Sequence, residues 1–168
     1  YLHSVTITGL TPGTKYYYQA LTDGSALSPA GDSSYFFKTA PPAGTATPFT
    51  FAILGDSDGD TGIAAQYANL KPDFVLTDGD IVYPYGGSVS ATTEGRQDGR
   101  YYDIYQATMK NTPYYAVCGN HDYHPNGCAT PDVMDQENPL PGGGKMGGGN
   151  TTYYFDYGNA RFVALNSN

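Results

Sequence analysis

The sequence Gly119-Asn120-His121-Asp122 decides the fold, because it is the third of three similar clusters along the chain. The clusters Gly55-Asp56-Ser57-Asp58 and Gly79-Asp80-Ile81-Val82-Tyr83 precede it. Each cluster directly follows a short apolar run that is typical of a strand. These runs are Phe49 to Leu54, Phe74 to Leu76 and Tyr114 to Val117.

The segments between these strands predict helices and therefore a parallel sheet. Asp60 is placed to cap a helix over Gly62 to Leu70, and a second helix is expected over Arg100 to Lys110. A strand, a helix and a strand within about 30 residues form a βαβ unit, whose strands run parallel. The three clusters should then meet at one edge of the sheet. Their carboxylates, phenol, carboxamide and imidazole are a set suited to oxygen-preferring metal ions.

The first 40 residues have a different character and predict the end of a β-sandwich. Ser4 to Thr8 alternates polar and apolar residues, and Tyr35 to Lys38 reads as a closing strand. Leu10-Thr11-Pro12-Gly13-Thr14-Lys15-Tyr16 resembles the tyrosine corner of fibronectin type III domains. We therefore expect a partial sandwich over 1–40, a Pro-rich linker over 41–48 and an α/β domain over 49–168.

The last part of the chain predicts a hairpin after a loop. Thr151 to Tyr157 and Ala160 to Leu165 are strand-like and flank Gly158-Asn159. Pro139 to Asn150 is too rich in glycine to hold one shape alone, so it is interpreted as a mobile surface loop.

The composition excludes some partners and favours an exported protein. The net charge of −8 argues against nucleic acid, and no apolar run reaches the roughly 18 residues that a membrane span needs. Few charges and many Tyr, Thr, Ser and Gly residues favour a secreted, extracellular or periplasmic location. Cys118 and Cys128 are then a candidate disulfide, with two unpaired thiols as the alternative. Asn150-Thr151-Thr152 is a candidate glycosylation site.

The order of the three clusters resembles that of the calcineurin-like metallophosphoesterases, and the position of Tyr83 resembles the purple acid phosphatase branch. The resemblance implies a partial metallophosphoesterase sandwich of parallel and mixed strands. It also implies a metal-dependent phosphoric ester hydrolase, with a phosphate monoester or related small molecule as its substrate.

The resemblance also assigns roles to individual residues. Two metal ions are implied, Fe(III) with a divalent ion of iron, zinc or manganese. Asp80 would be shared by both ions, Asp56 would bind the first and Asn120 the second. Tyr83 as a phenolate would favour Fe(III), and His121 would act catalytically on the phosphoryl oxygens or the leaving group.

Two histidine motifs that complete the family's metal site are not found, because the chain holds only His3, His121 and His124. The remainder of a longer protein is expected to supply these ligands. The alternative is a non-catalytic fragment, or an extracellular structural or assembly protein that keeps the fold.

Purely structural roles of single residues also stay open at this point. Asp56 could serve only as a turn or helix cap, and Tyr83 could be a core tyrosine like its many neighbours. Asp58 is interpreted as a turn residue and His124 as a surface loop residue. Asp78 is expected to bond to backbone and not to a metal.

Overall fold

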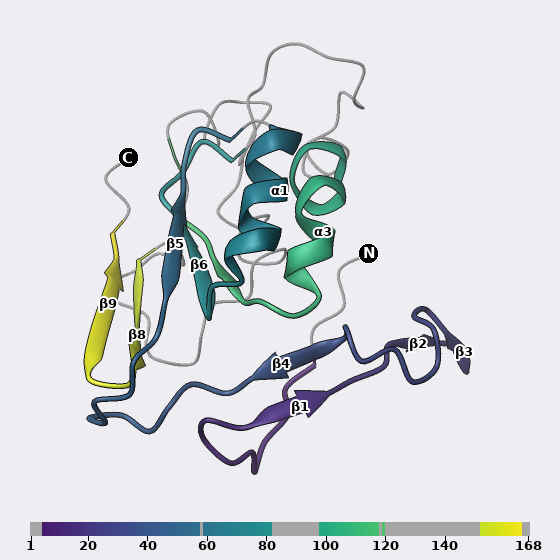
Figure 1. Ribbon diagram of the computed structural model, residues 1–168, viewed down its shortest axis with the longest axis horizontal. Coiled ribbons are helices and arrows are strands. Elements are labelled where there is room, and N and C mark those ends of the chain that lie inside the picture. The colour runs from purple at the N-terminus through teal and green to yellow at the C-terminus, as the bar shows by residue number, and fades with distance from the viewer. Residues whose placement is uncertain (1–4, 58, 82–97, 118, 120–151, 166–168) are drawn as a thin grey trace.

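The computed structural model describes residues 5–57, 59–81, 98–117, 119 and 152–165. These residues form a mixed α/β structure with a short parallel sheet, as the sequence predicted (Figure 1). The sheet has the order β5-β6-β7 and consists of β5 (Phe51–Leu54), β6 (Phe74–Thr77) and β7 (Tyr114–Tyr115). Both strand pairs are parallel.

Two helical segments cover one face of this sheet. They are α1 (Thr61–Leu70) and α3 (Asp103–Met109), and α3 continues from the π-helical turn η1 (Asp98–Tyr102). The predicted cap at Asp60 is confirmed, since its carboxylate accepts hydrogen bonds from the N–H groups of Gly62 (2.7 Å) and Ile63 (3.0 Å). The helix ends at Lys71, which has a left-handed φ of 49° and precedes Pro72.

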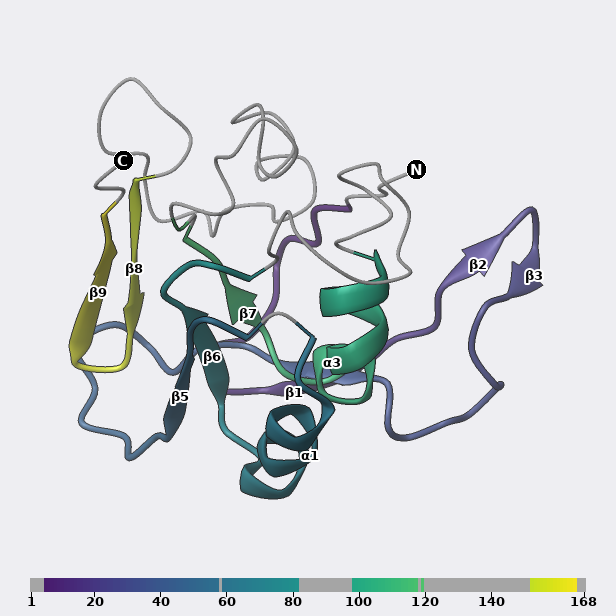
Figure 2. The same cartoon turned by 90° about the horizontal axis from the view of Figure 1, so that it is seen from above.

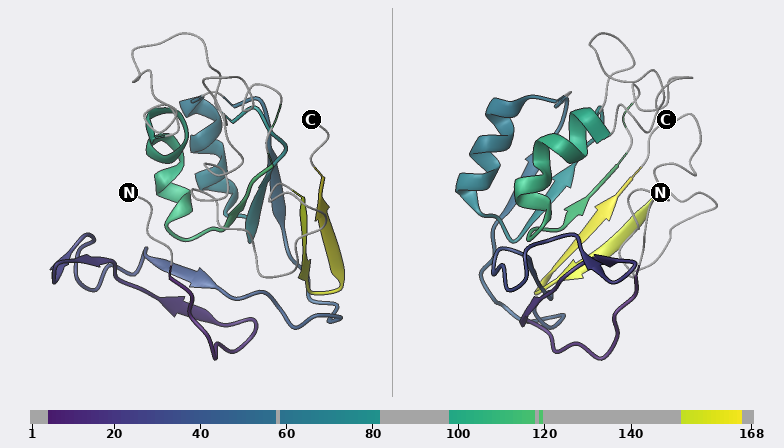
Figure 3. Two further views of the ribbon diagram at one scale, coloured as in Figure 1. Left: turned by 180° about the vertical axis from the view of Figure 1, so that it is seen from behind. Right: turned by 90° about the vertical axis from the view of Figure 1, so that its right-hand side faces the viewer.

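The predicted C-terminal hairpin is also present and packs on the opposite face of the sheet. Strands β8 (Tyr153–Tyr157) and β9 (Ala160–Ala164) pair antiparallel. The helices, the sheet and this hairpin form successive layers (Figure 3). The alternation of side chains along β6 explains the layering, because Phe74 faces the hairpin whereas Val75 faces the helices.

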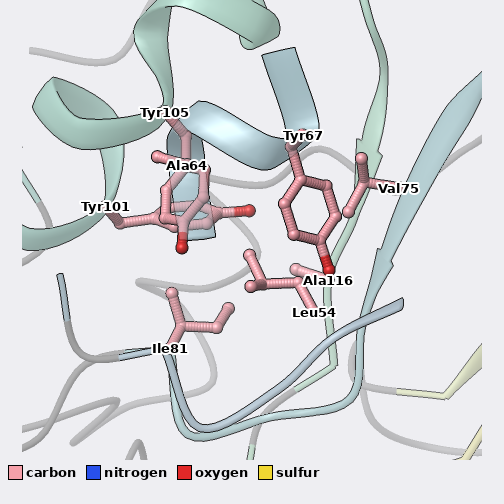
Figure 4. Close-up of a cluster of buried hydrophobic side chains, with 8 residues drawn as sticks. All are labelled: Leu54, Ala64, Tyr67, Val75, Ile81, Tyr101, Tyr105 and Ala116. Atoms are coloured by element: carbon pink, nitrogen blue, oxygen red, sulfur yellow. The ribbon is translucent and has the colours of Figure 1, made fainter. Parts of the chain in front are cut away.

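Each layer boundary holds its own core. Between the sheet and the helices, tyrosine and aliphatic side chains from α1, η1, α3 and the three strands pack together (Figure 4). Between the sheet and the hairpin, Phe74 is fully buried against Tyr153, Phe155 and Tyr157. In the part of the chain that the structure describes, no helix has the length and apolar character to cross a bilayer.

The N-terminal part consists of two small antiparallel pairs. Strand β1 (Lys15–Tyr17) pairs with β4 (Phe36–Lys38), and β2 (Leu21–Thr22) pairs with β3 (Ser25–Ala26). The β2–β3 hairpin projects away from the α/β part (Figure 2).

One expected feature of this part is present and one is absent. The Tyr16 hydroxyl accepts a hydrogen bond from the N–H of Thr11 at 2.8 Å, which is the contact expected of a tyrosine corner. The strand predicted from Ser4 to Thr8 is wrong for residues 5–8. Val5 is 82% exposed and Ile7 is 56% exposed, so these apolar side chains have no packing surface that would hold them in a sheet.

Candidate metal centre

The first two sequence clusters lie side by side at the carboxyl ends of β5 and β6. The Asp56 N–H donates to the Gly79 carbonyl and the Ser57 N–H donates to the Asp80 carbonyl, both at 3.2 Å. One step earlier, the Asp78 N–H donates to the Leu54 carbonyl at 3.0 Å. Backbone pairing therefore continues past the strands and holds Asp56 and Asp80 on adjacent segments.

Both aspartates adopt an uncommon backbone conformation. The φ angle is 54° at Asp56 and 51° at Asp80, in the left-handed region that residues other than glycine rarely enter. Aspartate tolerates this region better than most residues, but the conformation still costs on the order of 1–3 kcal/mol per residue. Such a conformation persists only where the surrounding hydrogen bonds impose it. It turns the backbone sharply at the end of each of the two strands.

The third cluster reaches the same edge of the sheet through β7. The Val117 N–H lies 3.2 Å from the Thr77 carbonyl and 3.3 Å from its hydroxyl oxygen. Two residues later, Gly119 lies directly against Asp80. A Cβ atom at position 119 would stand 2.3 Å from both the backbone nitrogen and Oδ1 of Asp80. Only a glycine allows this approach.

Gly55 has an equivalent place in the first cluster. A Cβ atom there would stand 1.8 Å from Oδ1 of Asp78. The glycines before Asp56 and Asn120 are thus explained by close contact with the segment that carries Asp78 and Asp80. The side chain of Asp78 is exposed, and its N–H completes the backbone pairing with β5.

The site is open to solvent on one side and anchored on the other. Asp56 is exposed and Asp80 is half-buried, whereas Ser57 between them is only 3% exposed. The Ser57 hydroxyl donates a hydrogen bond to the Ile81 carbonyl at 3.5 Å and so links the first two clusters on their buried side. Carboxylates that a rigid backbone holds at a solvent-accessible edge suit a hard cation.

Two residues that organise this edge were not singled out from the sequence. Ser57 and Thr77 are buried polar residues whose hydroxyl oxygens contact backbone groups of the neighbouring segments. The sequence held one signal for both residues. Each is a small polar residue at or just after the end of an apolar run, at a position where a buried residue is usually aliphatic.

The remaining predicted site residues lie outside the described residues. They are Asp58, Tyr83, Cys118, Asn120, His121, His124, Cys128 and Asn150. Among the residues that are described, no three side chains of His, Cys, Asp or Glu are grouped to hold a metal ion. The described edge thus brings together the backbone segments of Asp56 and Asp80 and the glycine that precedes Asn120, and metal binding by these residues stays a prediction.

Two purple acid phosphatases resemble this chain, one in sequence and one in fold. Purple acid phosphatase 23 of Arabidopsis thaliana is 28% identical over 189 residues, which cover 98% of this chain and 40% of that protein. The chain therefore spans well under half the length of this curated relative. A purple acid phosphatase from seeds of yellow lupin (Lupinus luteus) has a similar fold, with a TM-score of 0.58 and 19% sequence identity. That similarity covers 77% of this chain and 26% of the lupin chain.

The sequence model of one protein family matches the whole α/β part of the chain. The match runs from residue 49 to residue 167, which begins just before β5 and extends past the C-terminal hairpin. The aspartate clusters at the ends of β5 and β6 and the contact of Gly119 with Asp80 lie within it. This chain belongs to the calcineurin-like phosphoesterase family.

Proposed function

We propose that the protein containing this chain hydrolyses phosphate monoesters in a metal-dependent reaction of the acid phosphatase type. The observation that carries the proposal is that the described residues of the three sequence clusters meet at one sheet edge. Asp56 and Asp80 are linked there through backbone hydrogen bonds, and Gly119 contacts Asp80 directly. The family of the chain and its purple acid phosphatase relatives support the same chemistry.

A dinuclear metal centre fits the donors that this edge presents. Asp80 is the proposed shared ligand because it lies between the other two clusters, with Asp56 on one side and Gly119 on the other. Asp56 and Asn120 would each serve one ion, and Tyr83 would favour Fe(III) as its partner, with iron, zinc or manganese as the second ion. When bound, the metal pair would polarise the phosphoryl group and activate a water for in-line attack.

The chain's own residues have distinct tasks in this proposal. The left-handed conformations of Asp56 and Asp80 set the path of the backbone at the strand ends, and this would limit how far the backbone must move when an ion binds. Asn120 contributes an oxygen without a charge that would repel the anionic substrate. His121 is placed next to the ligands in the sequence and would hydrogen-bond a phosphoryl oxygen or give a proton to the leaving alcohol.

The rest of the proposal concerns the protein's surroundings. Further histidine ligands would come from other parts of the same protein, since His121 and His124 cannot complete two coordination shells. The low charge content and the many Tyr, Ser, Thr and Gly residues support an exported protein. In such a protein Cys118 and Cys128 would form a disulfide and Asn150 would carry a glycan, and peptide mass spectrometry under non-reducing conditions tests both.

The role of Asp80 can be tested with two chemically identical substitutions. In the full-length protein, Asp80→Asn should abolish hydrolysis of an aryl phosphate and lower the bound metal content. Asp60→Asn removes the same charge at a helix N-cap, where Asn serves as well as Asp, and should leave the activity near the original level. Equal activity of the two variants would contradict the proposed site.

A further inference from the structure

A cavity of about 630 Å³ lies between the N-terminal strands and the two helices. Strands β1 and β4 contribute Lys15, Phe36 and Lys38 to its walls, and the segment between α1 and β6 contributes Lys71 and Asp73. This segment leads into β6, whereas Asp80 follows that strand. The cavity is therefore at the opposite end of the sheet from the candidate metal centre.

The cavity gathers positive charge in a chain that is strongly acidic. The whole sequence has eight Lys and Arg residues and a net charge of −8, yet three lysines line this one cavity. Asp73 is the acidic residue among the lining residues, and Lys38 already pairs with it at 3.2 Å. Asp73 also accepts a hydrogen bond from the Thr50 N–H at 2.9 Å, so its charge is largely compensated.

The other two lysines that line the cavity are Lys15 and Lys71. The Lys15 ammonium stands 4.0 Å from the centre of the Phe36 ring, an interaction that orients the cation without neutralising it. Lys71 is held at the end of α1 through its backbone N–H, which donates to the Tyr67 carbonyl. Within the described part of the chain, neither ammonium forms an ion pair with a carboxylate.

The ends of the two helices oppose this positive potential but do not cancel it. Both α1 and α3 end near the cavity, and a helix C-terminus carries about half a negative charge at most. Two such ends and Asp73 together offset about two of the three lysine charges. The local charge balance in the cavity therefore stays positive.

We propose that this cavity binds a small multivalent oxyanion, such as an oligophosphate or a tricarboxylate. Its volume is in the range of pockets that bind small molecules, about 300–1,000 Å³. Lysines act as point charges that recognise charge more than shape, so phosphate and carboxylate groups share the required chemistry. A ligand here would bridge the N-terminal strands and the α/β part, and its binding does not depend on the proposed phosphatase activity.

The proposal is tested by calorimetric titration of the full-length protein with tripolyphosphate and, separately, with citrate. Metal ions are first removed with a chelator and dialysed away, so that neither hydrolysis nor binding at the metal centre contributes. Lys15→Gln and Lys71→Gln should each weaken binding of the tighter ligand about three- to tenfold. Lys71→Arg keeps the charge and should bind within about twofold of the original protein.

Arg161→Gln is the matched control, because it removes one positive charge on β9, where Arg161 pairs with Asp156 at 2.7 Å. It should leave binding unchanged. Failure of both ligands to bind at 0.1 M salt would overturn the proposal. An equal loss of affinity in Lys71→Gln and Arg161→Gln would also overturn it, because the effect would then come from net charge alone.

Discussion

At the scale of single residues, the candidate site depends on glycines and aspartates in unusual backbone settings. Asp56 and Asp80 both have positive φ angles, and the glycines before Asp56 and Asn120 lie against Asp78 and Asp80. These features lower the stability of the strand ends and constrain the path of the backbone that carries the two carboxylates. The backbone segments that carry Asp56, Asp80 and Gly119 therefore constrain one another.

Gly55 and Gly119 should differ sharply in how well each tolerates substitution by alanine. Gly119→Ala places a methyl group 2.3 Å from the backbone nitrogen of Asp80, which cannot move without shifting the strand end. We expect a loss of about 1–3 kcal/mol in the free energy of unfolding, with reduced metal binding. In Gly55→Ala the methyl group meets the carboxylate end of Asp78, an exposed side chain that can rotate away.

Urea denaturation of the two variants checks this prediction. Gly55→Ala should cost less than about 1 kcal/mol, because rotation of an exposed side chain relieves the contact. A Gly119→Ala variant as stable as the Gly55→Ala variant would show that the Asp80 segment is not held as tightly as its hydrogen bonds imply.

At the scale of elements, tyrosines carry the packing between the helices and the sheet. Tyr67 of α1 meets Tyr105 of α3 edge to face, with ring centroids 6.3 Å apart, and Tyr105 also contacts Tyr114 of β7. The Tyr114 hydroxyl donates to the Thr108 hydroxyl at 3.0 Å. The packing of this layer therefore depends on buried aromatic rings whose hydroxyl groups lose a proton, and become charged, when the pH exceeds their pKa.

Stability should consequently fall in alkaline solution. Burial raises the pKa of Tyr114 from its ordinary value near 10 to about 12, and the hydrogen bond with Thr108 only partly opposes this rise. The unfolded chain then loses the Tyr114 proton at a lower pH than the folded chain. The contribution of this group is complete below pH 10 and disappears as the pH rises toward 12.

Unfolding free energies measured between pH 9 and pH 12 test this expectation. The original chain should become steadily less stable above pH 10, and Tyr114→Phe should show a shallower decline because one raised pKa is gone. An identical pH dependence for the two chains would contradict the assignment of the raised pKa to Tyr114.

At the scale of the whole molecule, three polar contacts among the described residues tie the N-terminal part to the α/β part. The Tyr18 hydroxyl donates to the Lys110 carbonyl at 2.8 Å, and the Asn111 side chain donates to the Ser34 carbonyl at 3.3 Å. Lys38 pairs with Asp73 at 3.2 Å. Exposed contacts of this kind contribute modestly, so the relative placement of the two parts depends on several of them together.

The proposed metal site is expected to be complete only in the longer protein. We expect the 168-residue chain alone to hydrolyse an aryl phosphate slowly or not at all, because further histidine ligands would come from elsewhere in the protein. The full-length protein should be active, and Tyr83→Phe should remove any visible charge-transfer absorption. Robust metal-dependent hydrolysis by the 168-residue chain, measured with added iron and zinc, would show that other residues form the site.

Much of the fold could be predicted from local patterns. The cap at Asp60, the strand before each cluster and the hairpin around Gly158-Asn159 all depend on neighbouring residues, and all three are present. The strand over residues 5–8 was wrongly predicted because alternation alone does not supply a partner strand. The helix predicted over Arg100 to Lys110 begins inside the π-helical turn Asp98–Tyr102, which was not predicted, since side-chain periodicity does not distinguish a π-helix from an α-helix.

The sequence by itself determined the family, the parallel direction of the strands and the residue types at the strand ends, because these follow from motif spacing and short-range preferences. Only the tertiary structure decided the positive φ angles of Asp56 and Asp80, the contact of Gly119 with Asp80 and the lysine-lined cavity. Each of these depends on segments far apart in the chain whose distance is set by packing. Local sequence preferences carry no information about that distance.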